Sequence, residues 1–218
     1  MHLALPREMP KADVIIHAGD FSNHGTMEDA IRFFAWFNAI DYKHRICIAG
    51  NHDVFMERGS QSAINAIIPP GVTYLKESGV TIDGIKFWGS PYQPEFFNWA
   101  FNVPRGKEIR EHWDLIPADT DVLITHGPAK NILDHCPNFQ LPGSIIHVGC
   151  EELRKVLDQI KPRAHIFGHV HYPGGEFRQT KDTLSLNVAI CTEAYAPINK
   201  PQMFDIDQYG DARHIRIT

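Results

Sequence analysis

The sequence has few of the features that mark secreted, membrane-spanning or nucleic-acid-coating proteins. Its four cysteines lie far apart among 218 residues, without a C-x-x-C pair. No stretch approaches the roughly 18 apolar residues of a spanning helix, and the first residues do not resemble a signal peptide. The net charge is −5, and lysine and arginine are scattered, which argues against a nucleic-acid or membrane surface. We therefore expect a reduced, cytoplasmic setting without membrane contact.

The composition is that of an ordinary globular domain, with one exception. Hydrophobic residues make up 43% of the chain and charged residues 22%, and the length fits a single domain over residues 1–218. The exception is histidine, which occurs 13 times against 21 lysines and arginines together. A high histidine content alone decides nothing, so the argument depends on where these side chains lie.

Strand and helix signals alternate along the first part of the chain, which is typical of a layered α/β domain. Thr26 is expected to cap a helix, and Asp83-Gly84 predicts the turn of a hairpin. That helix should bury Ile31, Phe34, Ala35 and Phe37. Strands are expected over residues 13–18, 45–49, 121–125, 164–167, 185–189, 203–206 and 213–217. The pattern predicts two sheets sandwiched between helices.

Four of these expected segments end in short polar clusters that contain glycine. The clusters are Gly19-Asp20, Gly50-Asn51-His52-Asp53, Thr125-His126-Gly127 and Gly168-His169-Val170-His171. Ligands in α/β sheets collect beyond the carboxyl ends of strands, where neighbouring loops converge. Glycine allows sharp turns that bring side chains close to a common centre. The sequence therefore predicts one site built from four loops.

The residue types in these clusters indicate a metal site. Aspartate, asparagine and histidine offer oxygen and imidazole ligands without thiolate, which suits Mn, Fe, Zn or Ni. A carboxylate such as Asp20 can bridge two cations. Two cations about 3.5–4 Å apart can activate a water and neutralise a phosphate ester that would repel an anionic nucleophile.

At these residues the chain resembles the calcineurin-like metallophosphoesterases. The family pattern runs DxH, GD, GNH[DE], a lone His, then GHxH, and the last four blocks are present here in order. The segments at 89–94 and 97–102 are similar to the small metallophosphoesterase-domain (MPPED-like) branch. The resemblance implies a four-layer αββα sandwich of two mixed sheets. It also implies metal-dependent hydrolysis of a phosphate ester, by analogy a phosphodiester, through a metal-activated hydroxide.

The resemblance also assigns roles to individual residues. His52 would donate a proton to the leaving oxygen or stabilise its charge, and Asp53 would orient His52 or else cap the following helix. Two divalent metal ions are expected. Their ligands would be Asp20 as the bridge, Asn51, His126 and His169 at the second metal, and His171 at the first.

The DxH block has no counterpart in this chain. The fold is therefore expected without its first strand, either in a shortened chain or in a natural variant. The first metal would retain only Asp20 and His171, because His2, the only nearby histidine, has no partner aspartate or preceding strand and is not expected to substitute. Two readings stay open: a hydrolase acting on a small phosphate ester or nucleotide, or an impaired protein that binds metal or nucleotide. A nuclease is less favoured because no basic stripe follows a nucleic-acid backbone.

Other ring-bearing residues are expected to serve the fold. His17 and His165 lie within predicted strands, so both imidazoles should be buried and hydrogen-bonded. Five aromatic residues are expected mainly in the core, with Tyr92 and Phe97 as alternative walls of a substrate cleft. The five are Trp88, Phe96, Phe97, Trp99 and Phe101.

Overall fold

The computed structural model describes residues 9–138, 140–207 and 209–215. Its helices are α1 (Met27–Ala39), α2 (Val54–Arg58), α3 (Gln61–Ile67), α4 (Lys107–Trp113) and α5 (Glu151–Ile160). Its longer strands are β1 (Val14–Ala18), β2 (His44–Ile48), β4 (Ser78–Ile82), β5 (Ile85–Ser90), β8 (Val122–Thr125), β11 (Ala164–Phe167) and β13 (Leu184–Asn187). Its shorter strands are β3 (Thr73–Tyr74), β6 (Gln93–Pro94), β7 (Asn102–Val103), β9 (His135–Pro137), β10 (Ile145–His147), β12 (Phe177–Gln179), β14 (Met203–Asp205) and β15 (Arg213–Ile215).

The two larger sheets differ in their strand directions. One sheet has the order β1-β2-β3 with parallel pairing throughout its described strands. The other has the order β12-β13-β11-β8-β5-β4. It is mixed, because β4 and β12 are antiparallel to their neighbours while β13, β11, β8 and β5 run parallel. The expected α/β fold is confirmed, and the mixed character lies in the six-stranded sheet.

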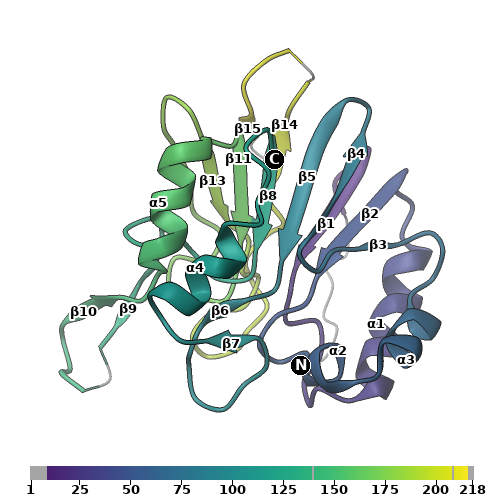
Figure 1. The fold of residues 1–218 in the computed structure, drawn as a ribbon, viewed down its shortest axis with the longest axis horizontal. Helices are drawn as coiled ribbons and strands as arrows, with labels where there is room; N and C mark the ends of the chain where they lie inside the picture. The colour runs from purple at the N-terminus through teal and green to yellow at the C-terminus, as the bar shows by residue number, and fades with distance from the viewer. Residues whose placement is uncertain (1–8, 139, 208, 216–218) are drawn as a thin grey trace.

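Three apolar clusters hold the layers together. Between the two sheets, Ile46 and Ile48 of β2 join a cluster with Ile124 and Ile166. Side chains of α1 and α3 pack with the three-stranded sheet, and those of α4 and α5 pack with the six-stranded sheet. Figure 1 shows α1, α2 and α3 on one side of the strands and α4 and α5 on the other. Each sheet has two faces with apolar side chains. The other sheet covers one of these faces and helices cover the other, so burial of apolar surface stabilises this layered arrangement.

Helix α1 begins as the sequence predicts but presents a different face to the core. The Thr26 side chain accepts a hydrogen bond from the backbone N–H of Asp29 at 3.1 Å, which satisfies one free donor of the first turn. The buried face consists of Ala30, Phe33, Phe34 and Phe37. Ile31 is 44% exposed and Ala35 is exposed, so their predicted burial is wrong. Spacings of three and four residues from Ala30 account for the observed face.

Strand β1 lies at an edge of its sheet. Among the described strands it is hydrogen-bonded only to β2, so no described strand pairs with its other edge. Residues 1–8, which include His2, lie outside the described part of the chain. The expectation that His2 does not replace a missing ligand therefore stays untested.

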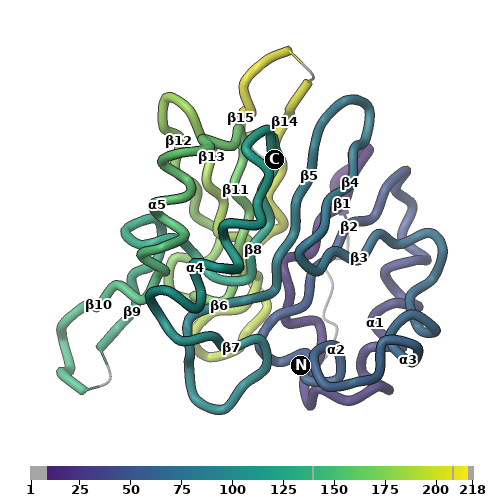
Figure 2. The backbone as a smooth tube through the Cα atoms, in the orientation of Figure 1, coloured from purple at the N-terminus to yellow at the C-terminus, as the bar shows by residue number. Residues whose placement is uncertain are grey.

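The remaining strands form small ribbons at the margins. Strands β9 and β10 pair as a hairpin that extends away from the layers (Figure 2), and β14 pairs with β15 near the C-terminus. The predicted hairpin at Asp83-Gly84 is confirmed, since β4 and β5 pair with Ile82 opposite Ile85. None of the helices in the described ranges has both the length and the apolarity needed to cross a bilayer.

Candidate metal centre

The four predicted polar clusters follow strands β1, β2, β8 and β11, as expected. Asp20 follows β1, Asn51 follows β2, His126 follows β8 and His169 follows β11. The pairs β1/β2 and β8/β11 are parallel, so the carboxyl ends of each pair meet at one edge of their sheet. Because the two sheets pack face to face, both edges contribute to the same centre.

The side chain of Asn51 joins the two histidines that come from the other sheet. Its Oδ1 lies 2.8 Å from Nε2 of His126 and 2.9 Å from Nδ1 of His169. Asn51 and His126 are buried, at 3% and 0% exposure. The ring centroids of His126 and His169 are 4.9 Å apart in an edge-on arrangement. Residues 51, 126 and 169 are thus brought together from distant parts of the chain.

Asp20 completes this group from the three-stranded sheet. One carboxylate oxygen, Oδ2, lies 3.3 Å from Nε2 of His126. The other, Oδ1, accepts a hydrogen bond of 2.9 Å from the backbone N–H of His52. Burial opposes ionisation of Asp20, but the adjacent positive charge of His126 and the hydrogen bond to it hold the pKa of Asp20 well below its usual range. Asp20 is therefore a carboxylate at neutral pH.

The charges of the two histidines follow from their surroundings. Burial disfavours a charged His126, but the Asp20 carboxylate outweighs burial and raises the pKa of His126. Burial, reinforced by His126, lowers the pKa of His169 to about 3. At neutral pH His169 is uncharged and therefore has a lone pair that can bind a metal.

The donor set fits a cation. Nδ1 of His126 must donate to the carbonyl oxygen of Ala18, at 2.9 Å, because a carbonyl only accepts. In the neutral ring this leaves a lone pair on Nε2, which faces two oxygen acceptors, Oδ1 of Asn51 and Oδ2 of Asp20. Three acceptors at such distances need a positive ion between them, either a proton or a metal. The ligand atoms of Asp20, His126 and His169 all lie within 4.8 Å of one another, which suits a divalent metal.

Tight backbone geometry produces this convergence. A Cβ on Gly50 would lie 2.4 Å from Oδ1 of Asp20 and 2.4 Å from Cε1 of His126, so a larger residue cannot occupy this position unchanged. Asp20 and His169 both have left-handed backbone angles, with φ of 60° and 66°. Such angles cost non-glycine residues about 1 kcal/mol or more and persist where the surroundings enforce them.

Comparison with known proteins agrees with this geometry. Residues 2–173 match the model of the calcineurin-like phosphoesterase family. The chain belongs to the calcineurin-like phosphoesterase family. It is 34% identical over 223 residues to metallophosphoesterase domain-containing protein 1 of Homo sapiens, which covers 92% of this chain and 67% of that protein. The same protein of Mus musculus gives the same figures.

Two further matches extend the comparison. A UPF0046 protein of Caenorhabditis elegans is 34% identical over 212 residues, which covers 91% of this chain and 69% of that protein. A solved crystal structure is 20% identical, covers 75% of this chain and 63% of its own, and superposes with a TM-score of 0.52. At that identity the structural match shows a shared fold and nothing further.

The other predicted site residues of this phosphoesterase-family chain lie around the group of four. His52 is bound to Asp20 through its backbone, and its ring centroid is 4.4 Å from that of Trp99. Asp53 occupies the N-cap position of α2 without a side-chain capping bond. Its carboxylate accepts from three backbone N–H groups, and none of its described hydrogen bonds comes from the His52 ring. Their catalytic roles remain predictions.

His171 stands apart from the ligand group. Its Nδ1 donates a 3.1 Å hydrogen bond to the carbonyl of Thr192, and its ring centroid is 5.2 Å from that of Tyr195. It is not a member of the three-residue group formed by residues 20, 126 and 169. Its proposed part in a first metal site therefore remains a prediction.

Three aromatic side chains lie next to histidines of the site, and none of them was predicted there from the sequence. Phe96 lies 5.9 Å from His169 by ring centroids, and Trp99 and Tyr195 contact His52 and His171. Phe96 is 49% exposed and Phe97 is 81% exposed, so their expected core packing is wrong. The run Phe96-Phe97-Asn98-Trp99 has no period that separates core from surface, which explains why its sequence was uninformative.

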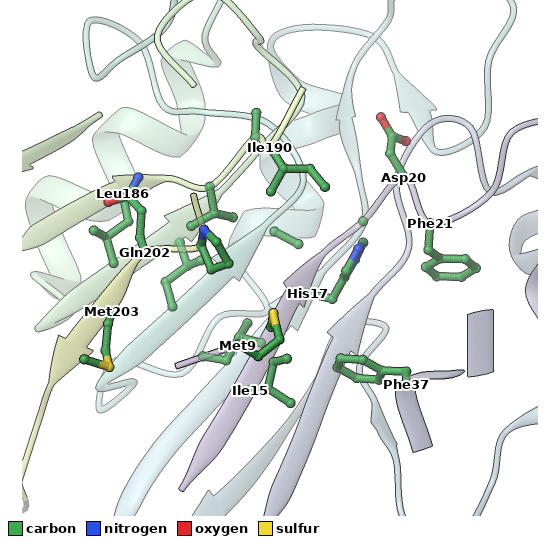
Figure 3. Close-up of a pocket in the computed structure, with 18 of the residues that line it drawn as sticks. Met9, Ile15, His17, Asp20, Phe21, Phe37, Leu186, Ile190, Gln202 and Met203 are labelled. Carbon is green, nitrogen blue, oxygen red and sulfur yellow. The ribbon is translucent and has the colours of Figure 1, made fainter. Parts of the chain in front are cut away.

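A mostly apolar cavity extends from the candidate centre along β1. Its volume is about 260 Å³, and its lining includes Asp20, His169 and His171 at the end nearest the ligand group. Figure 3 shows Ile15 and His17 along the strand, with Asp20 beyond its end. Nδ1 of His17 is buried without a hydrogen-bond partner among the described residues, so the expected hydrogen bond is not found at this nitrogen. Burial lowers the pKa of His17 to about 4.

Proposed function

We propose that this protein hydrolyses phosphate esters in a metal-dependent reaction, and that its substrates are small phosphodiesters or nucleotides. The observation that supports this most strongly is the convergence of Asn51 Oδ1 and Asp20 Oδ2 on Nε2 of His126, at 2.8 and 3.3 Å. Acceptors collected in this way bind a cation. Family membership makes hydrolysis of phosphoric esters the reaction class that such a cation serves.

The chain's own residues have distinct tasks in this proposal. Asp20, Asn51, His126 and His169 would hold divalent metal, which supplies Lewis acidity toward the phosphate and lowers the pKa of a water. The Ala18 carbonyl fixes the His126 ring so that Nε2 faces the site. The backbone N–H of His52 holds this residue beside the Asp20 carboxylate, and its imidazole would donate a proton to the leaving oxygen.

The reaction can be tested with the purified 218-residue protein, Mn²⁺ and bis-p-nitrophenyl phosphate. We expect turnover that is lost in Asp20→Ala. The matched control is Asp119→Ala, because the Asp119 side chain is 65% exposed and contacts Lys86 on the surface. Turnover no faster than in Asp20→Ala would count against the proposal.

A second candidate follows from the place of His171. The described residues gather one three-residue ligand group, and His171 is outside it. A single metal that binds phosphate without hydrolysing it would give a binding protein on the same fold. Metal analysis separates the two candidates: about two metals per chain favour the enzyme, and one favours the binding protein.

A further inference from the structure

Asp53 has a buried carboxylate that accepts hydrogen bonds from backbone N–H groups of two loops. Its Oδ2 accepts from Gly50 at 2.7 Å and from Asp20 at 2.9 Å. Its Oδ1 accepts from Ser22 at 2.8 Å. The residue is 1% exposed. One carboxylate thus connects the loop after β1 to the loop after β2.

The same two loops are also connected in the opposite direction. Oδ1 of Asp20 accepts from the backbone N–H of His52 at 2.9 Å. The Ser22 hydroxyl donates to the carbonyl of His52 at 2.9 Å. Asp20 is therefore bound at both ends, its backbone N–H to Asp53 and its carboxylate to the loop that carries Asn51.

This double attachment acts on a residue with a strained backbone. Asp20 has φ of 60°, a conformation that costs about 1 kcal/mol or more unless its surroundings enforce it. The hydrogen bond to Asp53 starts at the N–H of this very residue. Loss of that bond would let the backbone leave the left-handed region and carry the Asp20 carboxylate away from His126.

We propose that Asp53 is a positioning residue: it holds the backbone of Asp20 so that the Asp20 carboxylate meets His126 and Asn51 at the distances that bind metal. The inference rests on the metal-binding part of the proposed function and does not require hydrolysis. It differs from the sequence-based role, in which Asp53 orients the His52 ring. Partners that hold metal ligands in place typically change metal affinity about 10- to 100-fold when they are replaced.

Isothermal titration of the full chain with Mn²⁺ tests the inference. Asp53→Asn keeps the size of the side chain but replaces one acceptor oxygen with an NH₂ group, which cannot accept from backbone N–H. We expect its Kd for Mn²⁺ to rise at least tenfold. Thr26→Ala is the matched control, because it removes the capping hydrogen bond of α1, which follows the same loop, and leaves the hydrogen bonds of Asp53 and Asp20 in place. Its Kd should stay within about threefold of wild type.

The visible absorption spectrum of bound Co²⁺ reports the geometry of the metal ligands. A substitution that only lowers the stability of the fold would leave this spectrum unchanged. We expect the visible bands of the Asp53→Asn protein to shift, since the ligand geometry changes. If Asp53→Asn lowers the melting temperature but keeps both the Mn²⁺ Kd and the Co²⁺ spectrum of wild type, the inference is wrong. Should that variant not fold, Asp53→Glu serves instead: a Kd raised at least threefold supports positioning, and an unchanged Kd overturns it. Failure of the wild type to bind metal would overturn the proposed function as well.

Discussion

Oδ1 of Asn51 and Nε2 of His126 lie 2.8 Å apart, and in the neutral ring neither atom carries a hydrogen to share. The carbonyl of Ala18 accepts the Nδ1 proton of His126, so Nε2 carries either a lone pair or, in the protonated ring that Asp20 favours, a second proton. Asp20 adds a third acceptor at 3.3 Å from the same nitrogen. These three atoms can therefore share either a proton or a metal ion.

Gly50→Ala should damage the metal centre directly. The added Cβ would lie 2.4 Å from both Oδ1 of Asp20 and Cε1 of His126, so at least one ligand must move. We expect Mn²⁺ affinity to fall tenfold or more, and the free energy of unfolding to fall by about 1–3 kcal/mol.

Gly127→Ala is the matched control for this substitution. Its Cβ would lie 3.8 Å from the nearest atom, Cδ2 of His169, which is an ordinary contact. Titration calorimetry and urea unfolding should show little change in this variant. Equal losses in the two variants would contradict the packing argument.

The metal-free protein should lose stability as the pH falls below about 6.5, and His165 should contribute. Burial lowers the pKa of His165 from 6.5 to about 3. Between these values the unfolded chain binds a proton that the folded chain does not, so unfolding takes up a proton. The free energy of unfolding therefore decreases with falling pH, by up to about 1.4 kcal/mol per pH unit for each such group.

His165→Gln isolates this contribution. Nε2 of His165 lies 2.8 Å from Oγ1 of Thr125, and a glutamine amide offers a similar donor without titrating. In urea unfolding at pH 7, 6, 5 and 4 with EDTA, the stability advantage of wild type over the variant should shrink as the pH falls. If the free energy of unfolding changes with pH equally in wild type and in the variant, His165 does not cause the loss of stability at low pH.

The sequence predicted the loops of the site better than the contacts within them. Glycine-containing polar clusters after buried strands identify the carboxyl ends of β1, β2, β8 and β11, and this local pattern is enough to place residues 20, 51, 126 and 169 near one centre. The partners of Asp53 could not be predicted in this way. They are backbone groups, which every residue possesses, so their positions depend on the fold and leave no trace in residue type.

Two other differences also have physical causes. In α1 the run Phe33-Phe34-Ala35-Trp36-Phe37 is apolar on every side, so periodicity alone does not determine its buried face. The two histidines of Gly168-His169-Val170-His171 belong to one sequence motif, but only His169 joins the group of possible metal ligands. His169 has a left-handed φ of 66°, which turns the chain between them, and backbone angles of this kind are not written in a spacing pattern.

His52 should matter most for substrates with poor leaving groups. If its imidazole donates a proton to the leaving oxygen, His52→Gln should lower kcat by about 10²–10⁴ for phenyl or alkyl phosphodiesters. The loss should be much smaller for p-nitrophenyl esters, whose leaving group needs no proton. A series of diesters with graded leaving-group pKa values checks this. A uniform loss across the series would instead mean that His52 binds the phosphate.

The last prediction separates His169 from His171. The Nδ1 of His169 lies 2.9 Å from Oδ1 of Asn51 within the ligand group, whereas the Nδ1 of His171 donates to the Thr192 carbonyl. His169→Ala should therefore weaken the tightest Mn²⁺ site about 100-fold. His171→Ala should keep that site. It should lose only the binding of a second, weaker equivalent of Mn²⁺, together with the hydrolytic activity. Calorimetric titration with metal analysis of the dialysed proteins distinguishes these outcomes. If both variants lose the tight site equally, His171 must enter the same centre when metal binds, and the separation seen between the two histidines would not persist in the metal-bound protein.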